Sequence, residues 1–73
     1  MKTQNQRLDN TLRIERAIVR MTQAELAEKV DVSRQAINAI ETGKFMPSAL
    51  LAIKLARVFG KTVEDIFKIT DCI

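Results

Sequence analysis

The stretch that most constrains the fold is residues 22–44, TQAELAEKVDVSRQAINAIETGK, which contains two helix starts close together. Thr22 precedes the first helix and Glu25 lies three residues later, so each side chain can satisfy the other residue's free backbone amide in a capping box. Ser33 caps a second helix, which we expect to run to about residue 42. The stretch therefore predicts two short helices joined by a tight turn.

The apolar residues of this stretch recur at helical spacing, which gives each helix one apolar face. Leu26, Ala27 and Val30 form that face on the first helix, and Ile37 and Ile40 form it on the second. Ala27 is small enough to let the two helices cross closely. This pattern predicts a helix-turn-helix.

The outward face of the second helix decides what such a motif can do. It carries Arg34, Gln35, Asn38 and Ala39. A helix in the DNA major groove presents its N-terminal residues to the bases, where Arg matches guanine as a bidentate donor and Gln or Asn matches adenine. On chemistry alone, a scaffold helix with a solvated polar face explains the same residues equally well.

A longer motif separates these alternatives. The run T-Q-x-E-L-A-x-K-V-x-V-S-R-Q-x-I-x-x-I-E-x-G-K resembles the lambda repressor/Cro-type helix-turn-helix family, also called the XRE family. The continuation through MPS, LAIKLA and VEDIF is similar to the last two helices of that family, so the resemblance covers residues 12–67. It implies an all-α domain of five helices in which the third reads DNA. One departure is Asp31, where the family usually has Gly; Asp tolerates a left-handed backbone better than most residues.

The resemblance also implies roles for individual residues. Base reading would fall to Arg34, Gln35, Asn38 and Ala39, and contacts to the DNA backbone to Gln23, Ser33, Lys44 and Arg16. It further implies an ion pair between Arg16 and Glu41 that orients the reading helix. The alternative for Arg16 is a solvated surface arginine, which contributes little to stability.

The chain as a whole divides into three parts. Residues 1–9 are expected to be extended or flexible, residues 10–67 form the helix-turn-helix domain, and residues 68–73 form a tail. The first helix is expected to begin after residue 9 or 10 and to end at 19 or 20. Leu12, Val19 and either Ile14 or Ala17 would then face the core, and Phe45 would fill the core after the reading helix.

The tail alternates apolar and polar residues, which is typical of a short strand. Such a strand could pair with residues near 4–8, giving a short pair of terminal β-strands. Our hypothesis is that Ile66, Ile69 and the tail form a two-fold interface that spaces two reading helices about one DNA turn apart. A disordered tail is the alternative.

Length and charge agree with a small DNA-binding domain. The chain has 73 residues and a formal net charge of +3, enough for one domain with a modest core and a basic balance that permits DNA binding. No apolar run is long enough to cross a membrane, and the first residues are polar rather than typical of a signal peptide. We therefore expect a cytoplasmic protein.

The residue types needed for catalysis or metal binding are scarce. Cys72 is the only cysteine and there is no histidine, so neither a zinc site nor an activated nucleophile is expected. A redox-sensing thiol is less well supported than an incidental residue. We expect no enzyme activity, no cofactor and no small-molecule effector.

The sequence thus favours a sequence-specific regulator of transcription that binds double-stranded DNA. The simplest mechanism is that of a repressor, a homodimer that occupies a palindromic operator. Two alternatives use the same fold: an antitoxin that also binds a toxin protein, and an adaptor for protein interactions that no longer contacts DNA.

Overall fold

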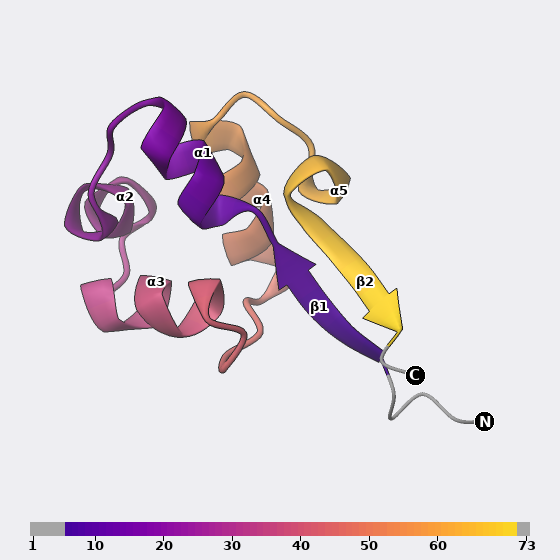
Figure 1. Cartoon of the computed structure of the whole chain (residues 1–73). Coiled ribbons are helices and arrows are strands. Elements are labelled where there is room, and N and C mark those ends of the chain that lie inside the picture. The colour runs from indigo at the N-terminus through magenta and orange to yellow at the C-terminus, as the bar shows by residue number, and fades with distance from the viewer. Residues whose placement is uncertain (1–5, 72–73) are drawn as a thin grey trace.

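A computed structural model describes residues 6–71, and this part of the chain forms five helices and two short strands (Figure 1). In chain order these are β1 (Gln6–Asn10), α1 (Leu12–Ile18), α2 (Gln23–Val30), α3 (Arg34–Glu41), α4 (Ala49–Val58), α5 (Val63–Ile66) and β2 (Phe67–Asp71). The predicted all-α, five-helix architecture is confirmed, and it is accompanied by a pair of terminal strands.

The caps expected for α2 and α3 are formed. The Thr22 hydroxyl accepts a hydrogen bond from the Glu25 N–H at 3.0 Å, and the Glu25 carboxylate accepts one from the Thr22 N–H at 2.8 Å. The Ser33 hydroxyl accepts from the Ala36 N–H at 3.1 Å. Between the helices, Asp31 has φ 61°, the left-handed conformation that a glycine would adopt most easily. The departure from the family pattern at Asp31 is therefore compatible with the turn.

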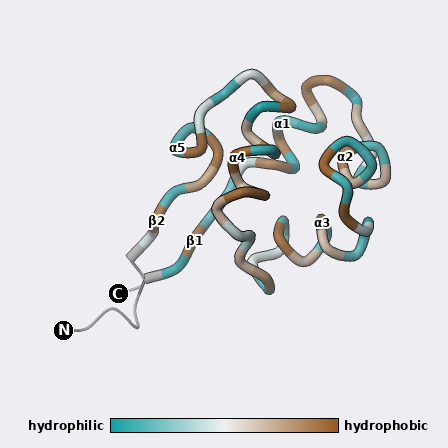
Figure 2. Tube along the Cα trace, turned by 180° about the vertical axis from the view of Figure 1, so that it is seen from behind, coloured by the Kyte–Doolittle hydropathy of each residue, from teal (hydrophilic) through white to brown (hydrophobic). Residues whose placement is uncertain are grey.

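The core lies where the apolar faces of the helices meet. Six side chains are fully buried: Leu12, Leu26, Ile37, Ile40, Leu55 and Ile66. They come from α1, α2, α3, α4 and α5, so one small core joins every helix. Hydrophobic and hydrophilic segments alternate along the trace (Figure 2), as expected for short helices with one buried face each.

The expectation for α1 is wrong in part. Leu12 is buried, but Ile14 is 59% exposed, Val19 is 55% exposed and Ala17 is also exposed. The buried position is instead Glu15, whose carboxylate lies 2.9 Å from the Lys61 ammonium. An ion pair compensates this carboxylate, so α1 can turn a charged residue inward, while its large apolar residues Ile14 and Ile18 stay exposed.

Phe45 does not fill the core, contrary to expectation, because it is 52% exposed. The backbone N–H groups of Lys44 and Phe45 both donate to the Ala39 carbonyl, at 2.8 and 3.1 Å. These bonds hold the chain on the surface of α3 as it leaves the helix. The aromatic ring therefore stays outside.

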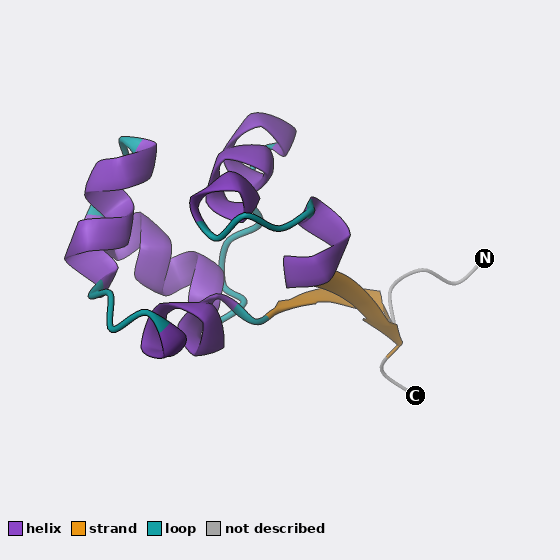
Figure 3. Ribbon diagram, turned by 90° about the horizontal axis from the view of Figure 1, so that it is seen from above, coloured by secondary structure: helices purple, strands orange, loops and turns teal. Residues whose placement is uncertain are grey.

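The two strands pair antiparallel within the chain, with Leu8 opposite Ile69. The pairing lies two residues further along than residues 4–8, and it projects from the helical body as a narrow arm (Figure 3). Ile66 is fully buried in the core of its own chain, so the expectation that its side chain forms a two-fold interface is wrong. Ile69 is 71% exposed.

Candidate nucleic-acid interface

The outward face of α3 presents three exposed polar side chains, those of Arg34, Gln35 and Asn38. Ala39 is half-buried, and its carbonyl is occupied by the N–H groups of the following loop. On the opposite face, Ile37 and Ile40 enter the core. The apolar face thus fixes which side chains of α3 point outward.

The C-terminal end of α3 is held by an ion pair with α1. Arg16 Nε lies 2.6 Å from Glu41 Oε2, and its Nη2 donates to Glu41 Oε1 at 3.0 Å, a bidentate arrangement. Arg16 Nη1 donates to the Met21 carbonyl at 2.8 Å. The Glu41 side chain is inaccessible to solvent, and that of Arg16 is 15% exposed. Arg16 therefore acts as a structural anchor between α1, the loop before α2, and α3.

Burial alone would raise the pKa of the Glu41 carboxyl. Hydrogen bonds donated by Arg16 and Gln23, together with the Arg16 charge, outweigh burial and hold this pKa below its usual value. The same hydrogen bond with Glu41 raises the pKa of Arg16. The pair is therefore fully ionised at neutral pH.

Gln23, the first residue of α2, links the two helices of the motif. Its Nε2 donates to Glu41 Oε1 at 3.0 Å and to Asn38 Oδ1 at 3.1 Å. Its Oε1 accepts a long hydrogen bond of 3.5 Å from Arg34 Nη1. Both hydrogens of the Gln23 amide are thus used inside the protein, whereas the first backbone N–H groups of α2 lack intrahelical acceptors. A phosphate at this helix end would be held by the backbone rather than by the Gln23 side chain.

The loop after α3 carries the remaining residue expected at the DNA backbone. Gly43 has φ 79°, which ends the helix, and Lys44 follows with an exposed side chain. Within residues 6–71 the Lys44 ammonium has no ion-pair partner. Ser33 lies at the other end of α3, where its oxygen caps the helix. Both residues lie on the surface at the ends of the candidate reading helix.

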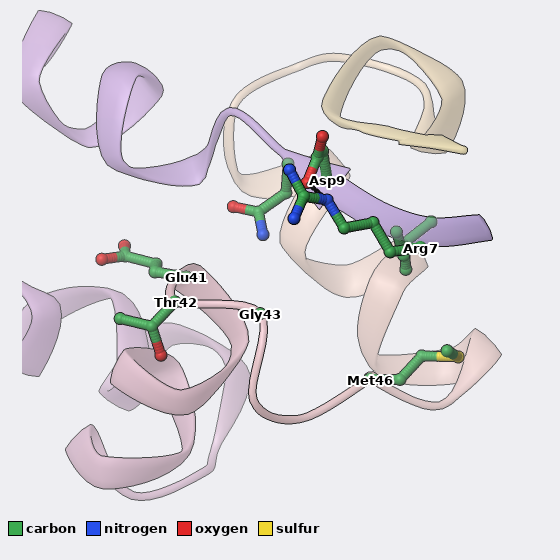
Figure 4. Close-up of a pocket in the computed structure, with 8 residues that line it drawn as sticks. Arg7, Asp9, Glu41, Thr42, Gly43 and Met46 are labelled. Carbon is green, nitrogen blue, oxygen red and sulfur yellow. Dashed lines mark ion pairs between the residues drawn. The ribbon is translucent and has the colours of Figure 1, made fainter. Parts of the chain in front are cut away.

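Sequence reasoning missed a contact that joins the strand arm to α3. Asn10 Nδ2 donates to the Ile40 carbonyl at 2.9 Å, and its Oδ1 accepts from the Leu12 N–H at 3.1 Å. An open groove lies beside this contact, between β1 and the end of α3, with Glu41, Thr42 and Gly43 on one side (Figure 4). On the other side an ion pair of 3.2 Å joins Arg7 to Asp9. An asparagine before a helix reads as a cap, so its bond to a residue 30 positions away has no local sequence signal.

Neither a metal-binding cluster nor a membrane-spanning helix is present among residues 6–71. No group of three or more His, Cys, Asp or Glu side chains there could hold a metal ion. None of the helices described is long and apolar enough to cross a membrane. Cys72 lies outside the described residues.

Comparisons with known proteins identify the chain as similar to helix-turn-helix regulators. Residues 12–66 match the helix-turn-helix family. An uncharacterized HTH-type transcriptional regulator of Methanocaldococcus jannaschii is 52% identical over 60 residues, which are 82% of this chain and 91% of the relative. The HTH-type regulator YgzD of Bacillus subtilis is 40% identical over the same shares of the two chains.

A solved structure agrees with these relatives. The clp gene regulator ClgR of Corynebacterium glutamicum superposes with a TM-score of 0.69 at 33% identity. The match covers 74% of this chain and 57% of ClgR, so this chain corresponds to only part of that regulator.

Proposed function

Because the chain belongs to the lambda repressor/Cro-type helix-turn-helix (XRE) family, we propose that it reads double-stranded DNA with α3 and represses transcription as a homodimer on a palindromic operator. DNA-binding regulation of transcription is the role that its relatives support. The observation that carries the finer proposal is the polar outward face of α3, a helix capped by Ser33 at its start and joined to Arg16 through Glu41 at its end. Membership of a family of DNA-binding regulators favours base reading over a merely solvated face.

Sequence choice would come from the exposed residues of α3. Arg34 and Gln35 lie in its first turn, the part of a reading helix that meets base edges. Asn38 lies one turn further along on the same face, and Ala39 offers a methyl group for apolar contact with a thymine methyl. These four residues carry the specificity in our proposal.

Affinity would come from contacts to phosphates on either side of α3. The first backbone N–H groups of α2, the Ser33 hydroxyl and the exposed Lys44 ammonium are the donors that we assign to the DNA backbone. The Arg16 guanidinium is committed to Glu41 and Met21, so its role is to orient the helix. The affinity should fall steeply with salt because each phosphate contact releases counterions.

Selection of bound duplexes from a random DNA library at near-physiological salt tests the proposal. We expect enrichment of a palindrome whose half-sites lie about 34 Å, or one helical turn, apart. Weak and uniform binding without an enriched sequence would refute sequence-specific reading.

Two single variants distinguish base reading from binding to the DNA backbone. Arg34→Ala should cost about 1–3 kcal/mol on the selected site and relax one base position, with a smaller effect on random DNA. Lys44→Ala should weaken binding to all sequences alike and lower the slope of affinity against salt by about one. Equal losses on selected and random DNA for Arg34→Ala would contradict its base-reading role.

One observation favours a protein partner as a second candidate function. Ile14 and Ile18 lie one turn apart on α1 and are 59% and 68% exposed, an unusual arrangement for a helix that packs on a core. An antitoxin or an adaptor would use such a surface to bind another protein. Absent or salt-insensitive DNA binding would favour this function over repression.

A further inference from the structure

We propose that Asn38, whose side-chain oxygen is held by Gln23, turns its NH₂ donors to DNA and therefore selects guanine, not adenine, at the base position that it reads. This inference rests on the proposed reading function of α3. It differs from the usual pairing of asparagine with adenine, which requires the side chain to offer its oxygen and its nitrogen to the same base. The orientation of the Asn38 side-chain amide decides between guanine and adenine.

The argument begins at Glu41, whose carboxylate can only accept hydrogen bonds because the pair with Arg16 keeps it ionised. Glu41 Oε1 lies 3.0 Å from the terminal amide of Gln23. The atom of Gln23 that faces this oxygen must be a donor, so it must be Nε2. The reverse orientation would set the Gln23 oxygen against a buried carboxylate oxygen.

The contact between Gln23 and Arg34 independently supports the same orientation of the Gln23 amide. Arg34 Nη1 lies 3.5 Å from it, and a guanidinium has only donors. The atom that faces Arg34 must therefore be the Gln23 oxygen. An acceptor on one side and a donor on the other together fix this amide.

Gln23 in turn fixes Asn38. Gln23 Nε2 carries a second hydrogen, which it donates to the Asn38 side chain. The two heavy atoms of this bond lie 3.1 Å apart. The Asn38 atom that meets this hydrogen must be Oδ1, because a flipped side chain would bring two NH₂ groups face to face. Asn38 is exposed, and among residues 6–71 its Nδ2 has no hydrogen-bond acceptor, so this group is left for a base.

The Nδ2 group selects the base. Adenine shows an acceptor and a donor on its major-groove edge, so a side chain that offers only its NH₂ group leaves the adenine N6 amino group unmatched. Guanine shows two adjacent acceptors, O6 and N7, and suits an NH₂ group. Thymine has a single acceptor beside a methyl group. Guanine is therefore the base that a fixed Asn38 should favour.

The test is library selection with the whole chain and two variants. For the wild type we expect a position of the half-site at which guanine is preferred over adenine by at least about fivefold, the lower end of what one good base contact gives. Asn38→Ala should abolish the preference at this position. Gln23→Met removes the hydrogen bond that fixes Asn38 and keeps a side chain of similar length, so adenine should become about as frequent as guanine there.

A matched control variant accompanies Gln23→Met. Gln35→Met is the same substitution on α3 itself, and it should alter a different position while leaving this guanine preference intact. The ratio of guanine to adenine at one position is independent of any affinity loss shared by all sequences. Circular dichroism of each variant establishes that the helices are retained.

The outcomes distinguish guanine selection by Asn38 from sequence-specific reading by α3, on which it rests. Absence of any enriched site for the wild type overturns both. An enriched site in which Asn38→Ala flattens no position, or flattens one occupied by a base other than guanine, overturns the assignment of Asn38 alone. A guanine preference that persists in Gln23→Met overturns the role of Gln23 in fixing Asn38.

Discussion

Replacement of Arg16 by methionine is the perturbation that most directly tests how α3 is held. The substitution keeps an unbranched side chain and removes the guanidinium that contacts Glu41 at 2.6 and 3.0 Å. The Glu41 side chain has no solvent exposure, so water cannot replace the lost partner. The carboxylate would keep only the hydrogen bond from Gln23. The Met21 carbonyl would lose its donor as well.

The expected loss follows from this burial. Removal of one partner from a buried ion pair costs about 3–5 kcal/mol, whereas an exposed pair contributes about 0–1 kcal/mol. A domain of this size has a total free energy of unfolding of about 5–10 kcal/mol, so Arg16→Met should approach the limit of folding. The double variant Arg16→Met/Glu41→Leu removes the uncompensated charge. It should recover most of the loss, to within about 1–2 kcal/mol of the wild type.

Urea unfolding at pH 7, followed by circular dichroism, measures these differences through the transition midpoint and slope. If Arg16→Met is already unfolded without urea, the double variant supplies the comparison, because it should still fold. A loss below about 1 kcal/mol for Arg16→Met would show that Glu41 is solvated and would refute the reasoning. A double variant less stable than the single variant would refute it as well.

The same pair predicts how stability depends on pH. The pKa of Glu41 is lower in the folded chain than its ordinary value of about 4.3, so its contribution is complete above that value. The contribution is lost as the pH falls through the lowered pKa and the carboxylate is protonated. Glu41→Gln cannot be protonated, and it should lack this part of the acid-induced loss when urea midpoints are compared between pH 7 and pH 3.

Three further substitutions test other features. Arg20 has φ 57°, so Arg20→Gly should raise the free energy of unfolding by about 1 kcal/mol in urea titrations; a lower value would show that the Arg20 side chain compensates the strain. Ser33→Ala should lower it by about 0.5–2 kcal/mol because the Ala36 N–H loses its side-chain acceptor and keeps only the Ser33 carbonyl, and an unchanged urea midpoint would contradict the importance of this cap. Ile69→Ser, at a 71% exposed position, should shift the mass measured by sedimentation from dimer to monomer with little effect on helix content. An unchanged dimer would remove Ile69 from the proposed interface.

Much of the helix-turn-helix could be predicted because its determinants are local. The caps at Thr22 and Ser33 act within three residues, and the apolar positions of α2 and α3 repeat within single helices. The ion pair between Arg16 and Glu41 joins residues 25 positions apart, and only the family resemblance suggested it. Local rules alone give the elements but not the contacts that orient them.

The orientation of α1 shows where such rules fail. Periodicity favours Val19 and either Ile14 or Ala17 for burial beside Leu12, yet Ile14 and Val19 are more than half exposed and Ala17 is exposed as well. Glu15 is buried because Lys61, 46 positions later, compensates its charge. Hydrophobic periodicity takes no account of so distant a partner, so it predicts burial of Leu12 but not of Glu15.

The contacts around Glu41 tie the stability of the domain to its reading face. One buried carboxylate receives Arg16 from α1 and Gln23 from α2, and Gln23 then sets the orientation of Asn38. The donors assigned to phosphates, by contrast, lie on a helix end and a loop, outside these contacts. Loosening the contacts around Glu41 should therefore reduce discrimination between sequences before it reduces affinity for DNA in general, because base reading depends on side-chain orientation to a degree that phosphate binding does not.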